Sequence, residues 1–381
     1  MIFLTVWQSE YATNRGEHMI DEYLSSFHEA VYKASHKARR NSISRRKVRD
    51  ITRAAAAWTT ESLIGSSKGT ALSVVLATVG CSHARGDIGG CTMCSYLLDG
   101  TDKAPSDDQL KTQFENALSK ITGQSAPLSV KLYTSGSFLD TQEVSLQARH
   151  DILSAIADDS RISEVVVESR PEYVVDSSMS ELRDVLGERR IEIGIGLESS
   201  NDIVRHLCVN KGFNLSDFSN AVDIARRFDI GIRAYVLLKP PFLTERMAIE
   251  DAKQTISYCG EIGVSTVSVN PVNVQKYTLV ERLWQRGEYR PPWLWSLVEL
   301  LRASRDALSR EINIVCDPVA AGKKRGVHNC GKCDKDIASA IRNYSITQNS
   351  AALSSLECDC MAQWKHTLDH EDVSLLVHND L

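Results

Sequence analysis

The feature that most constrains the fold is an alternation of short β-rich runs with amphipathic helical stretches. The runs have the length and composition of buried strands: Leu72–Thr78, Ser129–Tyr133, Glu164–Glu168, Ile191–Leu197, Gly231–Leu238 and Ser265–Asn270. Helical periodicity fills the intervals, near 108–121, 146–157, 179–186, 215–228 and 247–262. Because most runs are continuously apolar, we expect a parallel sheet buried on both faces. Six such units predict an α/β fold, an open and partial (β/α)6 version of the β/α barrel, with its chemistry at the carboxyl ends of the strands.

The segments on either side of the six units differ in pattern. Apolar residues at helical spacing in Ile20–Tyr32 and the helix-favouring Ala54–Ala57, with no strand pattern before Ala71, predict a helical start. After the last unit we expect a helix at Pro291–Arg310, a short strand at Ile312–Cys316 and a cysteine-containing tail. The expected parts are a helical extension with a basic arm (1–66), the partial barrel (67–290) and a small Cys-rich module (291–381).

Hydropathy and charge limit where such a chain works. The longest apolar run, near Ala71–Val79, is about half of what a membrane span requires. The apolar Met1–Trp7 has no basic flank and no small-residue cleavage site, which argues against a signal peptide. We therefore expect a cytoplasmic protein with no membrane partner.

The net charge of −5 is unevenly distributed. Between Lys33 and Arg53 there are nine Lys or Arg residues and one acid, Asp50, a local charge of +8 against −13 for the remainder. A basic arm on an acidic body predicts a polyanionic partner such as RNA. With few aromatic residues, this arm would contact the phosphate backbone rather than stack on bases. The alternative is a solvated helix face.

The ten cysteines fall into two clusters and three isolated residues. In a reducing compartment, clustered cysteines indicate metal ligands rather than disulfides. The isolated Cys208, Cys259 and Cys316 are expected to be small buried side chains.

The first cluster, Cys81, Cys91 and Cys94, lies directly after the first expected strand, at the reactive end of the barrel. Three thiolates can hold three irons of a 4Fe–4S cluster and leave the fourth iron open for a ligand that undergoes chemistry. Nearby glycines would let the loop wrap around the cluster, and Met93 could pack against the ligand. The alternative is a zinc knot with His83 as fourth ligand.

The second cluster comprises Cys330, Cys333, Cys358 and Cys360. Its first pair has zinc-knuckle spacing, and four thiolates match the tetrahedral ligand count of zinc. His328 or Cys316 could replace one ligand. A second iron–sulfur cluster and reduced structural thiols remain open as alternatives.

Together, these motifs resemble the radical S-adenosylmethionine (SAM) superfamily. The C-x9-C-x2-C spacing is longer than the usual first interval of three residues and is similar to the elongator-catalytic-subunit branch. Further segments at the strand ends match that branch: Tyr133–Asp140 (YTSGSFLD), Glu168–Glu172 (ESRPE) and Ile193–Ser199 (IGIGLES). The resemblance covers roughly Leu72 to Val272.

This resemblance implies a 4Fe–4S cluster on Cys81, Cys91 and Cys94, with SAM bound at the open iron. The residues that it places around SAM are Met93, Tyr96, Ser135, Gly136, Ser137, Glu168, Arg170, Gly196, Glu198 and Arg205. No catalytic acid or base can be named. Lys239, like Glu168, Arg170 and Glu198, lies at or near a strand end and is a candidate for that role, although a salt bridge or a SAM contact is the plainer interpretation.

The chain looks most similar to the radical SAM subunit of archaeosine synthase, the family called RaSEA. The resemblance rests on Gly80–Cys94 (GCSHARGDIGGCTMC), Thr134–Asp140 (TSGSFLD) and Arg325–Asp334 (RGVHNCGKCD). It implies a tRNA substrate and a partner protein, ArcS, that attaches lysine to a 7-deazaguanine base in the D-loop. This subunit would then cleave the lysine carbon–nitrogen bond through a 5′-deoxyadenosyl radical, as a lyase, and would need an electron donor.

Two other functions stay open. A relative from the same branch could act on another tRNA base or on a small molecule. A non-catalytic metal- and RNA-binding protein could use the cysteines structurally, but such a site has no reason to leave a ligand position free.

Overall fold

The computed structural model describes residues 14–46 and 49–372. Met1–Trp7 and Lys47 of the basic arm lie outside these residues. The strands are β1 (Ala56–Ile64), β2 (Ser67–Val75), β3 (Leu128–Tyr133), β4 (Ile162–Glu168), β5 (Arg190–Glu198), β6 (Gly231–Leu238), β7 (Thr266–Pro271) and β8 (Asn313–Val315). The α-helices are α2 (Asn14–Ile43), α3 (Ser82–Arg85), α4 (Asp107–Leu118), α5 (Leu146–Ala157), α6 (Asp176–Leu186), α7 (Leu215–Arg227), α8 (Glu245–Glu261), α9 (Leu279–Gln285), α10 (Leu294–Ala307), α11 (Asp334–Thr347) and α12 (Met361–His370).

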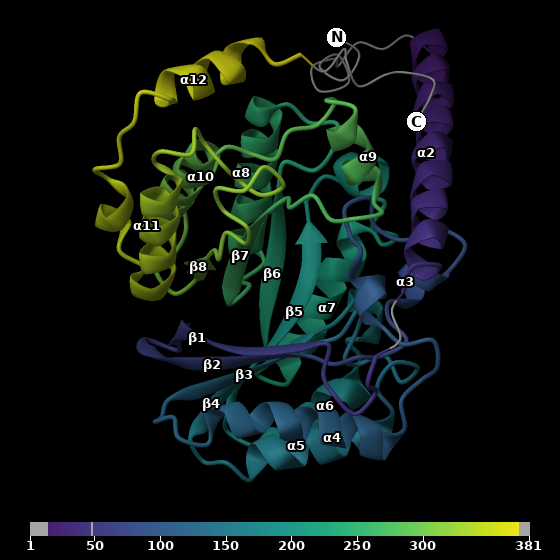
Figure 1. The fold of residues 1–381 in the computed structure, drawn as a ribbon, viewed down its shortest axis with the longest axis vertical. Coiled ribbons are helices and arrows are strands. Elements are labelled where there is room, and N and C mark those ends of the chain that lie inside the picture. Colours follow the sequence, from purple (N-terminus) through teal and green to yellow (C-terminus); the bar gives the residue numbers. More distant parts are fainter. Residues whose placement is uncertain (1–13, 47–48, 373–381) are drawn as a thin grey trace.

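The eight strands form one curled sheet in sequence order, β1 to β8 (Figure 1). From β2 to β8 every neighbouring pair is parallel, and helices α4, α5 and α6 cover the outer side of the first strands. Buried Val, Ile and Leu side chains on these strands join the helices in one core. The predicted partial barrel is therefore confirmed, with its six β/α units at β2 to β7.

The prediction that Ala54–Ala57 favours a helix and that no strand precedes Ala71 is wrong. Residues 56–64 form β1, which pairs antiparallel with β2. A two-residue turn, Gly65-Ser66, joins the strands, and Gly65 has a φ of +58°. A glycine at positive φ between two β-forming runs is a hairpin signal that outweighs the helix propensity of four alanines. The boundaries predicted at residues 66/67 and 290/291 stay predictions.

Charged side chains fill the amino-terminal end of the barrel. Glu192 accepts hydrogen bonds from Arg190 (2.7 Å) and Arg233 (2.8 Å), and Arg190 also pairs with Glu164 at 3.3 Å. Burial would raise the pKa of Glu192, but the two guanidinium groups hold it at about 2. This ionic layer closes one end of the barrel, so the carboxyl ends of the strands form its open mouth.

Helix α2 and the C-terminal module flank this mouth (Figure 1). Helix α2 contacts α9 and the 3₁₀ turn Tyr96–Asp99, and the Phe27 ring meets Phe242 edge to face at 5.0 Å. Helix α12 contacts α8, and α11 lies against β1. Within the described ranges, no helix combines the length and the hydropathy that a membrane crossing requires.

Candidate active site and metal centres

The loop carrying Cys81, Cys91 and Cys94 leaves the carboxyl end of β2, as predicted, and all three thiols are partly buried. Burial raises the pKa of Cys94 to about 12 and also raises that of Cys81, so without metal both thiols are protonated at neutral pH. Three thiolates fall one short of the four ligands of a structural zinc site, whereas three are the number that leaves one iron of a 4Fe–4S cluster open.

His83 does not complete a zinc knot with these thiols. Its Nε2 lies 2.7 Å from the Asn210 carbonyl oxygen, and its ring packs against Gly212. Burial, aided by Arg170, lowers the pKa of His83 to about 4. The neutral ring therefore donates a hydrogen bond from Nε2 and fastens the loop to the segment after β5.

Arg39 supports the cysteine loop, although the sequence pattern did not single it out. Its side chain is buried, and it donates to the carbonyl oxygens of Gly89 (3.1 Å) and Cys94 (2.8 Å). Helical spacing places Val31, Ala38 and Arg39 on one face of α2, and all three are buried. The spacing alone does not say which face of the helix docks on the protein.

Two further arginines of the predicted basic arm also serve the loop. Arg46 donates to the carbonyl oxygens of Leu97 (3.0 Å) and Thr101 (2.6 Å), and Arg49 pairs with Asp99 at 2.5 Å. The arm is therefore not a uniform phosphate-binding surface, because Arg39, Arg46 and Arg49 face the protein.

The turn after β3 packs directly on Cys81. The Cys81 N–H donates to the Ser135 carbonyl oxygen (3.3 Å), and a Cβ on Gly136 would lie 2.4 Å from the Cys81 Cα. The two serine hydroxyls are engaged within the protein. Ser135 donates to the Tyr96 carbonyl oxygen (2.8 Å), and Ser137 accepts from the Arg170 N–H (3.0 Å).

Glu143 anchors the same turn and was missed from the sequence. Its carboxylate accepts from the Ser137 N–H and from the Thr78 hydroxyl, both at 2.7 Å. Burial raises the pKa of Glu143 to about 7. No sequence signal marks this residue, since its role depends on how the β2 and β3 loops meet.

Charged groups converge at the ends of β4 and β5. Glu198, at a φ of +67° beside a β-bulge, pairs with Lys211 at 2.7 Å, and a Cβ on Gly196 would meet that Lys211 amine at 2.4 Å. Arg170 donates to Glu172 (2.5 Å) and to the Lys211 carbonyl oxygen (3.2 Å). Lys211, which the sequence pattern did not mark as a site residue, links the two strand ends.

Glu168 lies at the end of β4 among these groups. Burial raises its pKa to about 8, and Lys211 opposes that rise only in part. Such a carboxyl holds its proton near neutral pH and can donate a hydrogen bond.

The other residues expected around SAM are placed differently. Arg205 is fully buried, pairs with Asp202 and donates to the Ser199 carbonyl oxygen (2.7 Å). These contacts hold the loop after β5 in its conformation. Met93 is partly buried against the core, and Tyr96 is 55% exposed near the barrel mouth.

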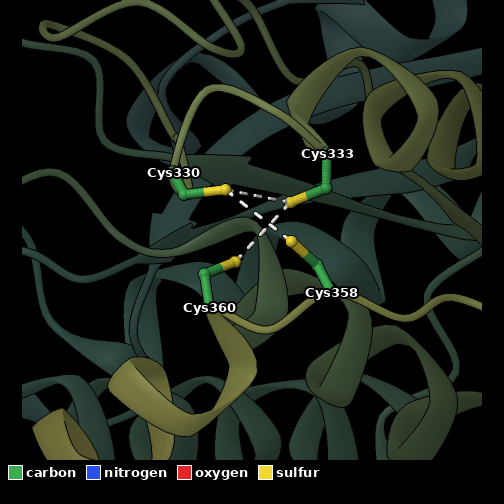
Figure 2. Close-up of side chains that lie close together, drawn as sticks. All are labelled: Cys330, Cys333, Cys358 and Cys360. Atoms are coloured by element: carbon green, nitrogen blue, oxygen red, sulfur yellow. Dashed lines mark hydrogen bonds between the residues drawn. The ribbon is translucent and has the colours of Figure 1, made fainter.

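The C-terminal cysteines form one compact group, as predicted. Their sulfur atoms all lie within 4.8 Å of one another and point toward a common centre (Figure 2). The members are Cys330, Cys333, Cys358 and Cys360. His328 instead lies with Nδ1 2.7 Å from the Gly326 carbonyl oxygen, and the buried Cys316 is not in the group.

Comparison with known proteins decides the family. No family model matches the chain. "Archaeosine synthase subunit beta" of Methanosarcina acetivorans is 42% identical over 318 residues, which cover 84% of this chain and 90% of that protein. The chain belongs to the archaeosine synthase subunit beta family. The predicted resemblance is thereby confirmed.

A second member of the archaeosine synthase subunit beta family, from Thermococcus kodakarensis, is 38% identical over 315 residues, covering 82% of this chain and 96% of its own. Among solved structures, Elp3 of Methanocaldococcus infernus, lacking residues 1–46, has a TM-score of 0.47 and 16% identity, covering 62% of this chain and 57% of that one. That TM-score is too low to bear on the fold, which rests on the strand order.

Proposed function

We propose that this chain is the radical SAM subunit of an archaeosine synthase, which cleaves a lysine adduct on a 7-deazaguanine base of tRNA. The observation that carries the proposal is the three-cysteine loop at the barrel mouth, in a chain of the archaeosine synthase subunit beta family. The family name describes one subunit, so a second protein is part of the proposal. An external electron donor is also required.

The residues around the loop fit a 4Fe–4S cluster with SAM. The Nη1 of Arg39 is buried and has no hydrogen-bond partner in the part of the chain that the structure describes, and the Arg39 charge opposes the rise in the pKa of Cys94. The Arg170 charge opposes the rise in the pKa of Cys81 in the same way, and Cys91 helps to raise the pKa of Lys211. Three cations beside three cysteines suit thiolates and the carboxylate of SAM, because each would compensate negative charge away from bulk water.

A 4Fe–4S cluster held by Cys81, Cys91 and Cys94, together with SAM, would supply the radical chemistry that this cleavage needs. The chain's own residues position and insulate this chemistry. Arg39 and Glu143 fix the loops that carry Cys94 and Cys81, and the Glu198–Lys211 pair fixes the segment after β5. The proton on Glu168 is available for a hydrogen bond at the mouth.

The outward side of α2 is the proposed tRNA surface. Arg39, Arg46 and Arg49 face the protein and are not part of this surface. A shallow hollow on the helix is lined by Tyr32, Lys33, His36, Lys37, Arg40, Asn41 and Ser44. Arg45 stacks on the Tyr277 ring at 5.3 Å, beyond the end of this hollow. These side chains present positive charge next to the barrel mouth, where phosphates could contact them.

An anaerobic assay tests the proposed function. The reconstituted protein is given dithionite, SAM and tRNA with or without the lysine adduct, and 5′-deoxyadenosine and the remaining adduct are quantified. We expect much more 5′-deoxyadenosine with the adduct tRNA, with loss of the adduct, and neither in Cys91→Ala. Cys259→Ala, which changes a buried thiol on α8, is the matched control and should keep activity.

The two alternative functions give different results in this assay. Equal 5′-deoxyadenosine with both tRNAs would keep the radical chemistry and reject the adduct as substrate. No 5′-deoxyadenosine from protein shown to contain its cluster would favour a non-catalytic metal- and RNA-binding protein.

A further inference from the structure

The C-terminal cysteine group has the dimensions of a site for a single metal ion. The sulfur–sulfur distances are 3.9 Å between Cys330 and Cys333, 3.7 Å between Cys330 and Cys358, and 3.7 Å between Cys333 and Cys360. A tetrahedron of sulfurs around zinc, with Zn–S bonds of about 2.3 Å, has edges of about 3.8 Å. We propose that these four thiolates hold one tetrahedral zinc ion that fastens the C-terminal module to the barrel.

The distances argue against the other interpretations of this group. In a 4Fe–4S cluster each thiolate binds a different iron, so the sulfurs stand much farther apart than 3.7 Å. A disulfide needs sulfurs about 2.05 Å apart, and all four cysteines are free thiols. Four thiolates leave no open position on a tetrahedral ion, so the site is structural rather than catalytic.

Groups beyond the four ligands are arranged for negatively charged sulfur. The indole Nε1 of Trp295 lies 3.3 Å from the Cys360 sulfur, and Nδ2 of Asn329 lies 3.4 Å from the Cys333 sulfur. Cys333 and Cys360 are also the N-cap residues that directly precede α11 and α12. N–H donors and helix amino termini both stabilise thiolates, which is the form that binds zinc.

The first pair of ligands sits in a loop that is already held in shape. The Asp334 carboxylate accepts from the backbone N–H groups of Asn329 (2.9 Å) and Gly331 (2.7 Å). Gly331 has a φ of +90°, a conformation that side-chain-bearing residues rarely adopt. This knuckle therefore presents Cys330 and Cys333 from a loop whose conformation is fixed before a metal binds.

The ion would tie together elements from three parts of the chain. Trp295 on α10 contacts Cys360, Trp364 on α12 donates to the Ser296 hydroxyl (2.8 Å), and Glu371 beyond α12 reaches Lys239 at the end of β6 (2.9 Å). Zinc at the start of α12 thus holds this helix and the residues after it in place against the rim of the barrel.

Metal analysis of protein purified anaerobically without added zinc tests this proposal. We expect one zinc per chain in the wild type and in the triple variant Cys81→Ala/Cys91→Ala/Cys94→Ala, which should lose iron. We expect the zinc content to fall at least tenfold in Cys358→Ser/Cys360→Ser. The control Cys259→Ala should keep the zinc content of the wild type. Iron that disappears with Cys358 and Cys360, in place of zinc, would overturn the proposal, and so would a wild type without zinc.

Two further measurements guard against a variant that merely fails to fold. Cobalt added to the metal-free triple variant should give the visible bands of a tetrahedral tetrathiolate site, and their absence would count against the proposal. Trp295→Phe keeps all four ligands but removes one N–H donor, so its zinc should pass to a chelator severalfold faster than in the wild type. An unchanged rate would contradict the role given to the indole. None of these readouts depends on activity toward tRNA.

Discussion

At the scale of single residues, Gly136 shows why the barrel mouth is sensitive to small changes. Its Cα faces the Cys81 backbone so closely that a Cβ would lie 2.4 Å from the Cys81 Cα and 2.1 Å from Glu143 Oε1. The backbone cannot give way as the end of a side chain can. Gly136→Ala should therefore shift Cys81 away from the turn after β3.

We predict that Gly136→Ala lowers cluster iron content and reduces SAM cleavage by about 10²-fold, the order of effect of a 1 Å misplacement. Iron analysis and 5′-deoxyadenosine formation measure this. Gly123→Ala is the control, because no described residue lies within 4 Å of an added Cβ there. Equal iron and activity in the two variants would show that the Gly136–Cys81 contact is not required.

Glu168 gives a pH-dependent prediction. Its pKa is about 8 in the folded protein because of burial, against 4.5 for a free carboxyl. Between these values the folded protein binds more protons than the unfolded one, so this residue makes the free energy of unfolding fall as pH rises from about 4.5 to 8. Glu168→Gln does not titrate. Its stability relative to wild type, from denaturant unfolding, should rise between pH 5 and pH 8.5. A constant difference would mean that Glu168 is ionised throughout.

Arg39 marks the limit of what single residues reveal in the sequence. The spacing and types of the cysteines indicate an iron–sulfur loop, whereas the charge run around Arg39 indicates a solvated or RNA-binding arm. A charge count does not reveal that this guanidinium is buried, because burial depends on where α2 docks. The same holds for Glu143, whose partners come from two loops.

Arg39→Met should lower the free energy of unfolding by about 1–3 kcal/mol, since the carbonyl oxygens of Gly89 and Cys94 lose their donor. It should also lower iron content after reconstitution. The exposed neighbour Arg40 provides the control, and Arg40→Met should leave both quantities unchanged. If Arg39→Met and Arg40→Met lost stability and iron content equally, Arg39 would not specifically support the cysteine loop.

At the scale of elements, the two faces of α2 have different surroundings. The inner face closes over the cysteine loop so tightly that a Cβ on Gly89, which has a φ of +77°, would lie 2.7 Å from the His36 Cα. The outer face carries Lys33, Lys37 and Arg40. One helix thus carries the support for the cysteine loop on one face and the proposed RNA surface on the other.

Neutralising the outer face should weaken tRNA binding without changing the metal site. Lys37→Gln/Arg40→Gln should reduce the slope of log affinity against log salt by about one for each phosphate that the helix no longer neutralises. Binding titrations over a range of salt measure this. Lys111→Gln/Lys120→Gln removes the same charge from the exposed side of α4 and the turn that follows it. If both pairs change the slope equally, only net charge matters.

The elements themselves were largely predictable. The ranges predicted from periodicity, 146–157 and 231–238, are the observed bounds of α5 and β6. Long buried segments such as these carry a strong pattern. It failed at β1, an edge strand with exposed faces whose pattern is weak. The hairpin turn at Gly65 was the better signal there.

At the scale of the whole molecule, the barrel and the C-terminal module meet at Lys239. This residue follows β6 at a φ of +62°, its side chain is only 2% exposed, and its amine lies 2.7 Å from Glu245 and 2.9 Å from Glu371. Sequence could place Lys239 near a strand end, but Glu371 is more than 130 residues away and follows the cysteine-rich tail. Only the folded chain reveals the pair.

Glu245 is buried and Glu371 is partly exposed, so the two ion pairs of Lys239 should contribute differently to the free energy of unfolding. Lys239→Met leaves the Glu245 charge buried and unpaired, and should lower the free energy of unfolding by about 3–5 kcal/mol. Glu371→Gln leaves that buried pair intact and should cost about 1 kcal/mol or less.

Lys253→Met, which breaks weaker ion pairs of 3.4 Å to Glu250 and Glu299, is the matched control and should also cost about 1 kcal/mol or less. Denaturant unfolding of the three variants measures this order. A Lys239→Met cost no larger than that of Lys253→Met would mean that the module is held to the barrel without this charge pair.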